Sequence, residues 1–126
     1  MKFNLAMAGG GALLAVIAGA QSLSAAPPAP DGALLFRQRC ASCHADTTGK
    51  PSPIGPNLAR VVGRKAGSAA FAYSPALKQS GLVWTRANLD KFLTSPGKLV
   101  PGTRMVIAVA DAAQRKAILD HLAKPR

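Results

Sequence analysis

The stretch CASCH, residues 40–44, decides how this sequence is interpreted. Its two cysteines are separated by two residues, and a histidine directly follows the second cysteine. A pair with this spacing could bind zinc, exchange thiols and disulfides, close a small disulfide, or hold a haem. The remainder of the chain has to discriminate among these four chemistries.

The other residues of the chain disfavour most of these alternatives. A structural zinc site needs about four ligands, and Cys40, Cys43, His44 and the distant His121 would form an irregular set. A thioredoxin-like pair is expected in a βαβ unit, which the sequence lacks, whereas a disulfide between the two cysteines stays open in an oxidising compartment. Thiols at positions i and i+3 share one face of a helical turn, and Cys-x-x-Cys-His is the signature of covalent c-type haem attachment. We therefore predict one haem, with His44 as an iron ligand.

The first residues have the pattern of a secretory signal peptide. Lys2 precedes the apolar run Leu5–Ala20, and cleavage is predicted after Ala26, with Ser24 and Ala26 at the recognised small positions. An uncleaved membrane anchor is the alternative, but the run is shorter than the roughly 20 residues that span a bilayer. The predicted organisation is a signal peptide over residues 1–26, a linker over 27–30 and one domain over 31–124, exported to the periplasm.

The charge balance predicts an acidic partner. The chain has 16 Lys and Arg against 5 acidic residues, all of them Asp, and a net charge of +11. A strongly positive surface attracts acidic proteins, anionic membranes or nucleic acid. Nucleic acid is disfavoured because the chain is predicted to be exported and has no long basic tract interleaved with aromatic residues.

The sixth iron ligand would separate a carrier from a catalyst, because an open position binds oxygen or peroxide. Met105 is the only methionine outside the predicted signal peptide, and it follows Pro101 and Gly102 in a loop without helical or strand periodicity. A methionine there is well placed to be presented to a ligand. The other candidate, His121, lies beside an apolar helical stripe, which predicts a packing or surface role.

Several linked segments resemble class I cytochromes c, close to mitochondrial cytochrome c and its short bacterial relatives. The resemblance covers about Asp31–Leu122 and is carried by GALLFRQRCASCH, GPNLARVVGRKAG, FAYS, GLVW, LDKFLTSPGKLVPGTRM and ILDHL. The spacings from His44 to Pro56 and from Trp84 to Met105 also match that family's pattern.

The resemblance implies roles for individual residues. It makes His44 and Met105 the axial iron ligands and Pro56 the carbonyl that binds the second nitrogen of His44. Around the haem propionates it implies a set of polar residues: Tyr73, Ser74 and Trp84 as donors, Arg64 nearby, and Thr103 beside the ligand loop. It also implies that the first helix crosses the last helix at Gly32 and Phe36.

Four positions depart from the mitochondrial pattern. Phe92 replaces a tyrosine near the methionine sulfur, Leu77 an internal asparagine, Ile107 an aromatic residue after the ligand, and His121 an aromatic residue of the last helix. These changes affect the polar network around the haem and leave the two ligands in place.

The pattern predicts an all-α fold, in which three main helices and long loops surround one covalently bound haem. The first helix is expected from an Asp31 N-cap through about Cys40, with Leu34, Leu35 and Phe36 on its buried side. Residues 45–75 are predicted to form an irregular loop organised by the haem. The remaining expectations are a short turn near Ala76–Gln79, a helix capped by Thr85 that ends before Pro96, and a helix capped by Asp111 that runs to about Ala123.

The predicted function is that of a monomeric periplasmic monohaem electron carrier, not an enzyme, in a respiratory or related electron-transport chain. Its partners would be acidic redox proteins: a reductase-like donor, and an oxidase, peroxidase or dehydrogenase acceptor. By resemblance, Arg39, Lys98 and Arg104 flank the exposed haem edge where these proteins would dock. The alternatives are a haem enzyme or gas sensor with a labile sixth ligand, and a membrane-tethered or dehydrogenase-associated cytochrome subunit.

Overall fold

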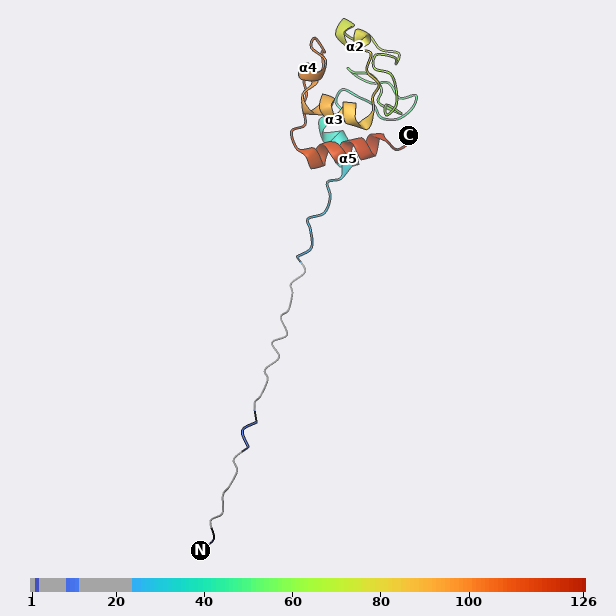
Figure 1. The fold of residues 1–126 in the computed structure, drawn as a ribbon. Helices are drawn as coiled ribbons and strands as arrows, with labels where there is room; N and C mark the ends of the chain where they lie inside the picture. The colour runs from blue at the N-terminus through green and yellow to red at the C-terminus, as the bar shows by residue number, and fades with distance from the viewer. Residues whose placement is uncertain (1, 3–8, 12–23) are drawn as a thin grey trace.

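The computed structural model describes residues 2, 9–11 and 24–126. Most of the predicted signal peptide, residues 1–26, therefore lies outside the described residues, and its cleavage stays a prediction. Among the residues that are described, no helix is both long and apolar enough to cross a membrane. In Figure 1 residues 24–30 lead away from the helical domain.

Three helices form a packed frame at one end of the domain. These are α1 (Gly32–Arg39), α3 (Arg86–Thr94) and α5 (Ala112–Leu122), and α5 packs against both α1 and α3 (Figure 1). At the α1–α5 crossing, a methyl group added to Gly32 would overlap the carbonyl oxygen of Ala117. The two backbones can approach this closely only because residue 32 has no side chain.

Side-chain caps begin each of these helices where the sequence predicted. Asp31 Oδ1 accepts hydrogen bonds from the N–H of Ala33 at 2.9 Å and of Leu34 at 3.2 Å. Thr85 and Asp111 do the same for α3 and α5, at 3.1 and 2.8 Å. Each cap satisfies a backbone donor that the helix itself cannot pair. The predicted starts of all three main helices are confirmed.

The apolar core lies between these helices and the loops that follow α1. Ile118 of α5 has 0% of its surface exposed, and the other core side chains include Phe36, Val61, Trp84, Leu89, Phe92, Leu93, Val100, Val109, Leu119 and Leu122. The prediction that Leu34 faces this core is wrong, since it is 43% exposed while Phe36 is 3% exposed. Successive helical residues are about 100° apart, so three in a row cannot all face one side.

The remainder of the described domain is largely irregular. Residues 45–74 contain turns and bends, and their one regular pairing is the isolated bridge between Lys65 and Val83. Two short helices complete the fold: α2 (Pro75–Gln79), where a turn was predicted, and α4 (Pro96–Leu99), which was not predicted. Pro96 begins α4 because a proline suits the first position of a helix. The described part of the chain has no strand, and the all-α class is confirmed.

Candidate haem site

The CASCH segment forms a tight turn at the end of α1. The N–H of Cys40 bonds the Phe36 carbonyl at 2.8 Å, and the N–H groups of Cys43 and His44 both bond the Cys40 carbonyl, at 3.0 and 2.9 Å. This additional turn keeps both cysteines and the histidine on one short, ordered segment. Both thiols are half-buried, and neither forms a disulfide.

The protonation of Cys40 disfavours thiol exchange. Burial raises the pKa of the Cys40 thiol to about 11, although the charge of Arg39 opposes this shift. Reactive dithiol pairs have the opposite property, a thiol whose pKa is lowered toward neutrality. A protonated, half-buried thiol is compatible with attachment to a cofactor and unsuited to a redox cycle of its own.

His44 is held at a defined ring orientation. Its Nδ1 lies 2.7 Å from the carbonyl oxygen of Pro56. That oxygen can only accept, so Nδ1 carries the hydrogen and Nε2 keeps its lone pair free for a metal. Gly55 lies close to the imidazole, and a methyl group there would overlap the ring. The geometry thus prepares one nitrogen of His44 for coordination.

The loop after His44 is closed by hydrogen bonds within it. The N–H of Ala45 bonds Ser52 Oγ at 2.8 Å, and the carbonyl of Ala45 accepts from the N–H of Leu58 at 2.8 Å. The side-chain amide of Asn57 donates to the carbonyls of Thr47 and Lys50, both at 2.8 Å. These bonds place Pro56 opposite His44. Sequence analysis did not assign Ser52 or Asn57 a role, because their partners are backbone carbonyls and amides that only the folded loop brings together.

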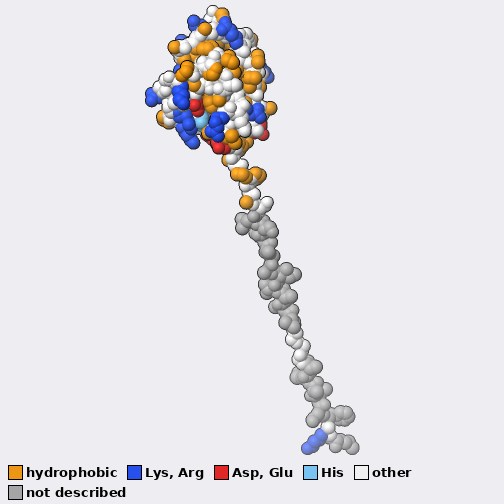
Figure 2. Space-filling view, turned by 180° about the vertical axis from the view of Figure 1, so that it is seen from behind, with side chains coloured by type: hydrophobic (Ala, Val, Ile, Leu, Met, Phe, Trp, Pro, Cys, Tyr) orange, Lys and Arg blue, Asp and Glu red, His pale blue; other side chains and the backbone are white. Residues whose placement is uncertain are grey.

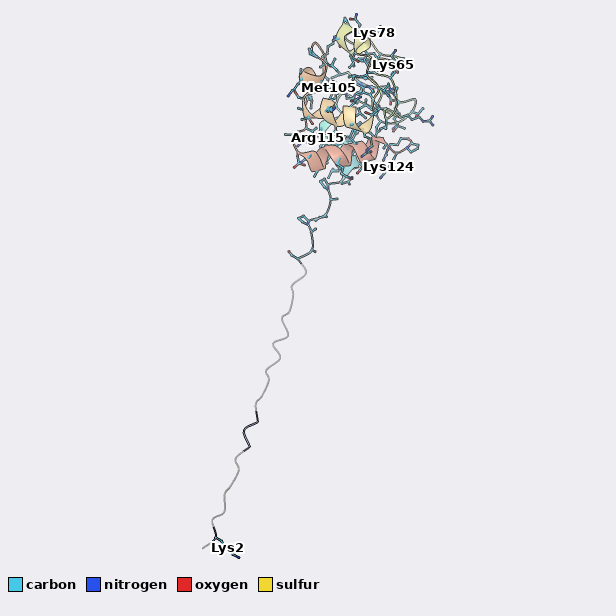
Figure 3. All side chains as sticks on the ribbon, in the orientation of Figure 1. Lys2, Lys65, Lys78, Met105, Arg115 and Lys124 are labelled. Carbon is cyan, nitrogen blue, oxygen red and sulfur yellow. The ribbon has the colours of Figure 1, made fainter. Side chains whose placement is uncertain are left out.

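Met105 lies in the loop after α4. Its side chain is half-buried and packs against the apolar core, and in Figure 3 it lies beside α3 and α4. The N–H of Met105 lies 3.4 Å from Thr103 Oγ1, so Thr103 supports the loop that carries Met105 directly. Arg104, between them, donates to the Ala72 carbonyl at 3.0 Å and ties this loop to residues 45–74.

The residues predicted to hold propionates fall into two groups. Tyr73, Ser74 and Trp84 are buried, and neither the Tyr73 hydroxyl nor the Trp84 indole N–H is hydrogen-bonded to another described residue. Ser74 Oγ accepts from the N–H of Leu77 at 3.2 Å, which leaves its own hydrogen free to donate. Arg64 differs, because its guanidinium bonds the carbonyls of Asn57 and Ala59 at 3.0 and 3.2 Å. The Tyr73 hydroxyl and the Trp84 indole N–H both keep some exposed surface, because the one fully buried side-chain atom without a partner among the described residues is Gln114 Oε1. Donors that no protein acceptor engages remain available to a carboxylate-bearing cofactor.

Internal contacts use every acidic side chain of the chain. Asp31 and Asp111 cap helices, and the other three form the pairs Asp46–His121 at 2.6 Å, Asp90–Arg115 at 2.8 Å and Asp120 with Arg86 and Lys116. Burial opposes ionisation of Asp46, yet hydrogen bonds from His121 and Thr47 and the charge of Arg126 lower its pKa. Figure 2 shows many Lys and Arg and few Asp side chains on the face it displays.

His121 is buried, as a packing role predicts, with 5% of its surface exposed. Its polar contacts with Asp46 and Arg126 were not predicted. Seventy-five positions separate His121 from Asp46, and no spacing in the sequence links them.

The fold and the site together define a class. The CASCH turn at the end of α1 offers two free thiols and an imidazole with one nitrogen ready for a metal. Other parts of the same fold supply a half-buried methionine, Met105, and the donors of Tyr73 and Trp84, from which no described residue accepts. This donor set fits a haem with two carboxylates, covalently attached through thioethers. The class is that of an all-α c-type haem protein.

Comparison with known proteins identifies the family. A family model described as cytochrome c matches residues 29–124, and the chain belongs to this family. It is 44% identical over 88 residues to cytochrome c of Theileria annulata, covering 70% of this chain and 76% of that protein. It is 40% identical over 97 residues to cytochrome c2 of Rhodoblastus acidophilus, covering 75% and 91% respectively.

A solved structure agrees with this assignment. Cytochrome cH from Methylobacterium extorquens superposes with a TM-score of 0.66 at 39% identity, and the match covers 72% of this chain and 92% of that chain. The chain is a class I c-type cytochrome with that family's helical fold. Membership implies one covalently bound haem and a role in carrying electrons.

Proposed function

We propose that this protein is a periplasmic one-electron carrier whose single haem is attached through Cys40 and Cys43 and coordinated by His44 and Met105. The hydrogen bond from His44 Nδ1 to the Pro56 carbonyl, at 2.7 Å, carries the proposal. It sets the tautomer that a haem ligand needs and holds the ring in one plane.

The haem, held by His44 and Met105, would supply a one-electron iron couple. The protein's part is to hold both ligands still, so that gaining or losing an electron requires little rearrangement. His44 is fixed by Pro56 and Gly55. Met105 is supported by Thr103 and by packing on the core. Tyr73, Ser74, Trp84 and Thr103 would donate to the buried propionates, and Arg64 would lie beside them.

Thioether bonds to Cys40 and Cys43 would anchor one edge of the haem. A methionine as the second iron ligand would raise the reduction potential relative to a site with two histidine ligands. With both His44 and Met105 bound, no iron position would be left for oxygen, and this favours electron transfer over oxygen chemistry. We therefore propose that the protein is not an enzyme. We also propose that it acts as a monomer.

The partners are proposed to be acidic redox proteins that dock near Arg39, Lys98 and Arg104. Support comes from the charge distribution: all five aspartates are committed to internal contacts, so most of the positive charge is left for intermolecular attraction. All three side chains are exposed. Steering of this kind produces fast and weak encounters that depend on salt.

The first test is the far-red absorption of the purified ferric protein, where sulfur bound to haem iron gives a weak charge-transfer band. We expect the band in the wild type and its loss in Met105→Ala, together with a lower reduction potential. Val106→Ala is the matched control, because it changes an exposed residue next to Met105 in the same loop and keeps the sulfur. A covalent haem without the band in the wild type would show that the sixth position is open or differently ligated.

A second test concerns docking. Lys98→Glu and Arg104→Glu should slow electron transfer to an acidic redox protein at low ionic strength and have little effect at high ionic strength. Lys124→Glu, which makes the same charge change beyond the end of α5, should have a smaller effect. Equal slowing by all three variants would assign the attraction to net charge and would remove the docking site.

A further inference from the structure

His121 contacts the chain on both sides of the haem-attachment turn. Its ring stacks on Phe36 with centroids 5.4 Å apart and planes at 29°, and its Nε2 lies 2.6 Å from Asp46 Oδ2. Phe36 accepts the hydrogen bond of Cys40 at the end of α1, and Asp46 follows His44 by two residues. The side chain of His121 on α5 therefore contacts residues on both the N-terminal and the C-terminal side of CASCH.

The tautomer of His121 follows from its second partner. The Arg126 guanidinium lies 3.1 Å from Nδ1 and can only donate, so Nδ1 accepts and Nε2 donates its hydrogen to Asp46. Arg126 is itself held, since its carbonyl accepts from Thr48 Oγ1 at 2.6 Å and from the Thr48 N–H at 3.2 Å. These contacts join α5, the residues after it and the loop after His44 into one closed network.

Asp46 belongs to the hydrogen-bonded loop after His44, which also positions Pro56. Ala45, its neighbour, bonds both Ser52 Oγ and Leu58, and the N–H of Gly55 bonds the Cys43 carbonyl at 2.7 Å. A movement of Asp46 would therefore be transmitted to the His44–Pro56 contact. His44, Asp46 and His121 also line one hollow of about 410 Å³, which places the three side chains around a common space.

A packing role alone does not account for this arrangement. An apolar aromatic residue at position 121 could stack on Phe36 without burying polar atoms. Instead the His121 side chain is 6% exposed and that of Asp46 is 21% exposed. Burying such a pair costs free energy that an apolar contact would not, so the hydrogen bond needs a reason beyond stability.

We propose that His121, acting through Asp46, is a positioning residue that sets the orientation of the His44 imidazole, and with it the electronic state of the iron. The inference rests on the proposed haem ligation. It assigns to α5 a direct part in tuning the site, in addition to its part in the helical frame. The device depends on the pair of residues: neither His121 nor Asp46 alone would perform it.

The test compares His121→Phe, Asp46→Ala, Asp46→Asn and the double variant His121→Phe/Asp46→Ala in the holoprotein. His121→Phe keeps the stack on Phe36 and removes both hydrogen bonds, whereas Asp46→Asn keeps an acceptor for Nε2 and removes the charge. The readouts are the reduction potential and the ferric NMR pattern of the haem methyl groups, which reports the plane of the axial histidine. Asp120→Asn is the matched control, because it removes the adjacent carboxylate on the exposed side of α5.

His121→Phe and Asp46→Ala should change the methyl pattern in the same way, and the double variant should add nothing further. Asp46→Asn should preserve the pattern, and the control should leave both readouts unchanged. The proposal is overturned if His121→Phe lowers only thermal stability, or if Asp46→Asn changes the pattern as much as Asp46→Ala does. Should His121→Phe fail to fold, the two Asp46 variants decide between these outcomes alone.

Two further measurements separate this proposal from the function on which it rests. Nitrogen NMR of the wild-type histidines should show the His121 hydrogen on Nε2, and finding it on Nδ1 would overturn the network without touching the haem. Conversely, a wild-type spectrum without methionine ligation would remove the proposed function before any variant is compared.

Discussion

The helical frame and the segment 45–74 reach order by different means. In the frame, α1, α3 and α5 satisfy their own backbone groups, and their side chains supply most of the apolar core. In the segment 45–74, backbone groups are satisfied one at a time by side chains such as Ser52 and Asn57, and few residues are buried. A long irregular loop of this kind is stable when something else organises it.

This difference shows that stability depends mainly on the helical frame, whereas the candidate site depends mainly on the segment 45–74. Each region contains one glycine at a close contact: Gly32 lets α1 approach α5 in the frame, and Gly55 lets the segment 45–74 approach the ring of His44. Adding one methyl group at each position disturbs a different region. The predictions below use such paired changes, and they run from the largest expected effect to the smallest.

Gly32→Ala should be the most destabilising change. The new methyl group would overlap the Ala117 carbonyl oxygen, which is rigid helix backbone and can yield only if α1 and α5 separate. Overpacking of this kind should lower the free energy of unfolding by about 3 kcal/mol. Urea denaturation monitored by circular dichroism measures it, with Gly97→Ala in α4 as control.

Gly97 has no atom within 4 Å of the added methyl group, so the control should be neutral or stabilising by up to about 1 kcal/mol. A loss of stability at Gly97 as large as that at Gly32 would mean that any glycine in these helices is intolerant, and the close crossing would not be the cause.

Gly55→Ala should sharpen the distinction by affecting the site more than the frame. The methyl group would overlap the His44 ring, and the ring must move away from Pro56. We expect a loss of about 1 to 2 kcal/mol in the free energy of unfolding, together with an altered ferric spectrum. An unchanged spectrum would show that the glycine contact does not set the ring position.

Asp111→Ala removes the cap of α5 and should lower the free energy of unfolding by about 1 kcal/mol, with no change in the ferric spectrum. Ser74→Ala makes the corresponding change at α2 and should also disturb the spectrum, because Ser74 is a proposed propionate donor. If both caps alter stability and leave the spectrum alone, the role of Ser74 is that of a cap only.

Lowering the pH should decrease the free energy of unfolding of the helical frame. Hydrogen bonds from the N–H groups of Leu34 and Ala33 lower the pKa of Asp31, and those from Lys116 and Arg86 lower the pKa of Asp120. A carboxyl group whose pKa is lowered in the folded state stabilises the fold at pH values above its unfolded-state pKa of 3.8. This contribution is lost as the pH falls through the folded-state pKa.

Urea midpoints measured between about pH 5 and pH 2 should therefore decrease toward acid, and Asp120→Asn should decrease less steeply than the wild type. Because both carboxyl groups are exposed, this effect should be the smallest of the four. Parallel curves for the two proteins would show that the Asp120 pairs contribute nothing to stability.

The sequence was sufficient to predict most of the candidate site, because its signals are local. CASCH is five consecutive residues, and Met105 is the only methionine near a Pro-Gly turn. Caps at Asp31, Thr85 and Asp111 were predictable because each bonds an N–H two or three positions away. Leu34 was misplaced because neighbouring apolar residues were assigned to one face without regard to the helical angle.

The sequence alone thus predicted the attachment chemistry and determined the helix starts and the all-α class, since each depends on residue types at short fixed spacings. The tertiary structure decided which distant residues meet: Gly32 with Ala117, His44 with Pro56, and His121 with Asp46. These contacts depend on how the irregular segment folds back over the helices. No local periodicity encodes that path, because its hydrogen bonds join side chains to backbone groups that become neighbours only after folding.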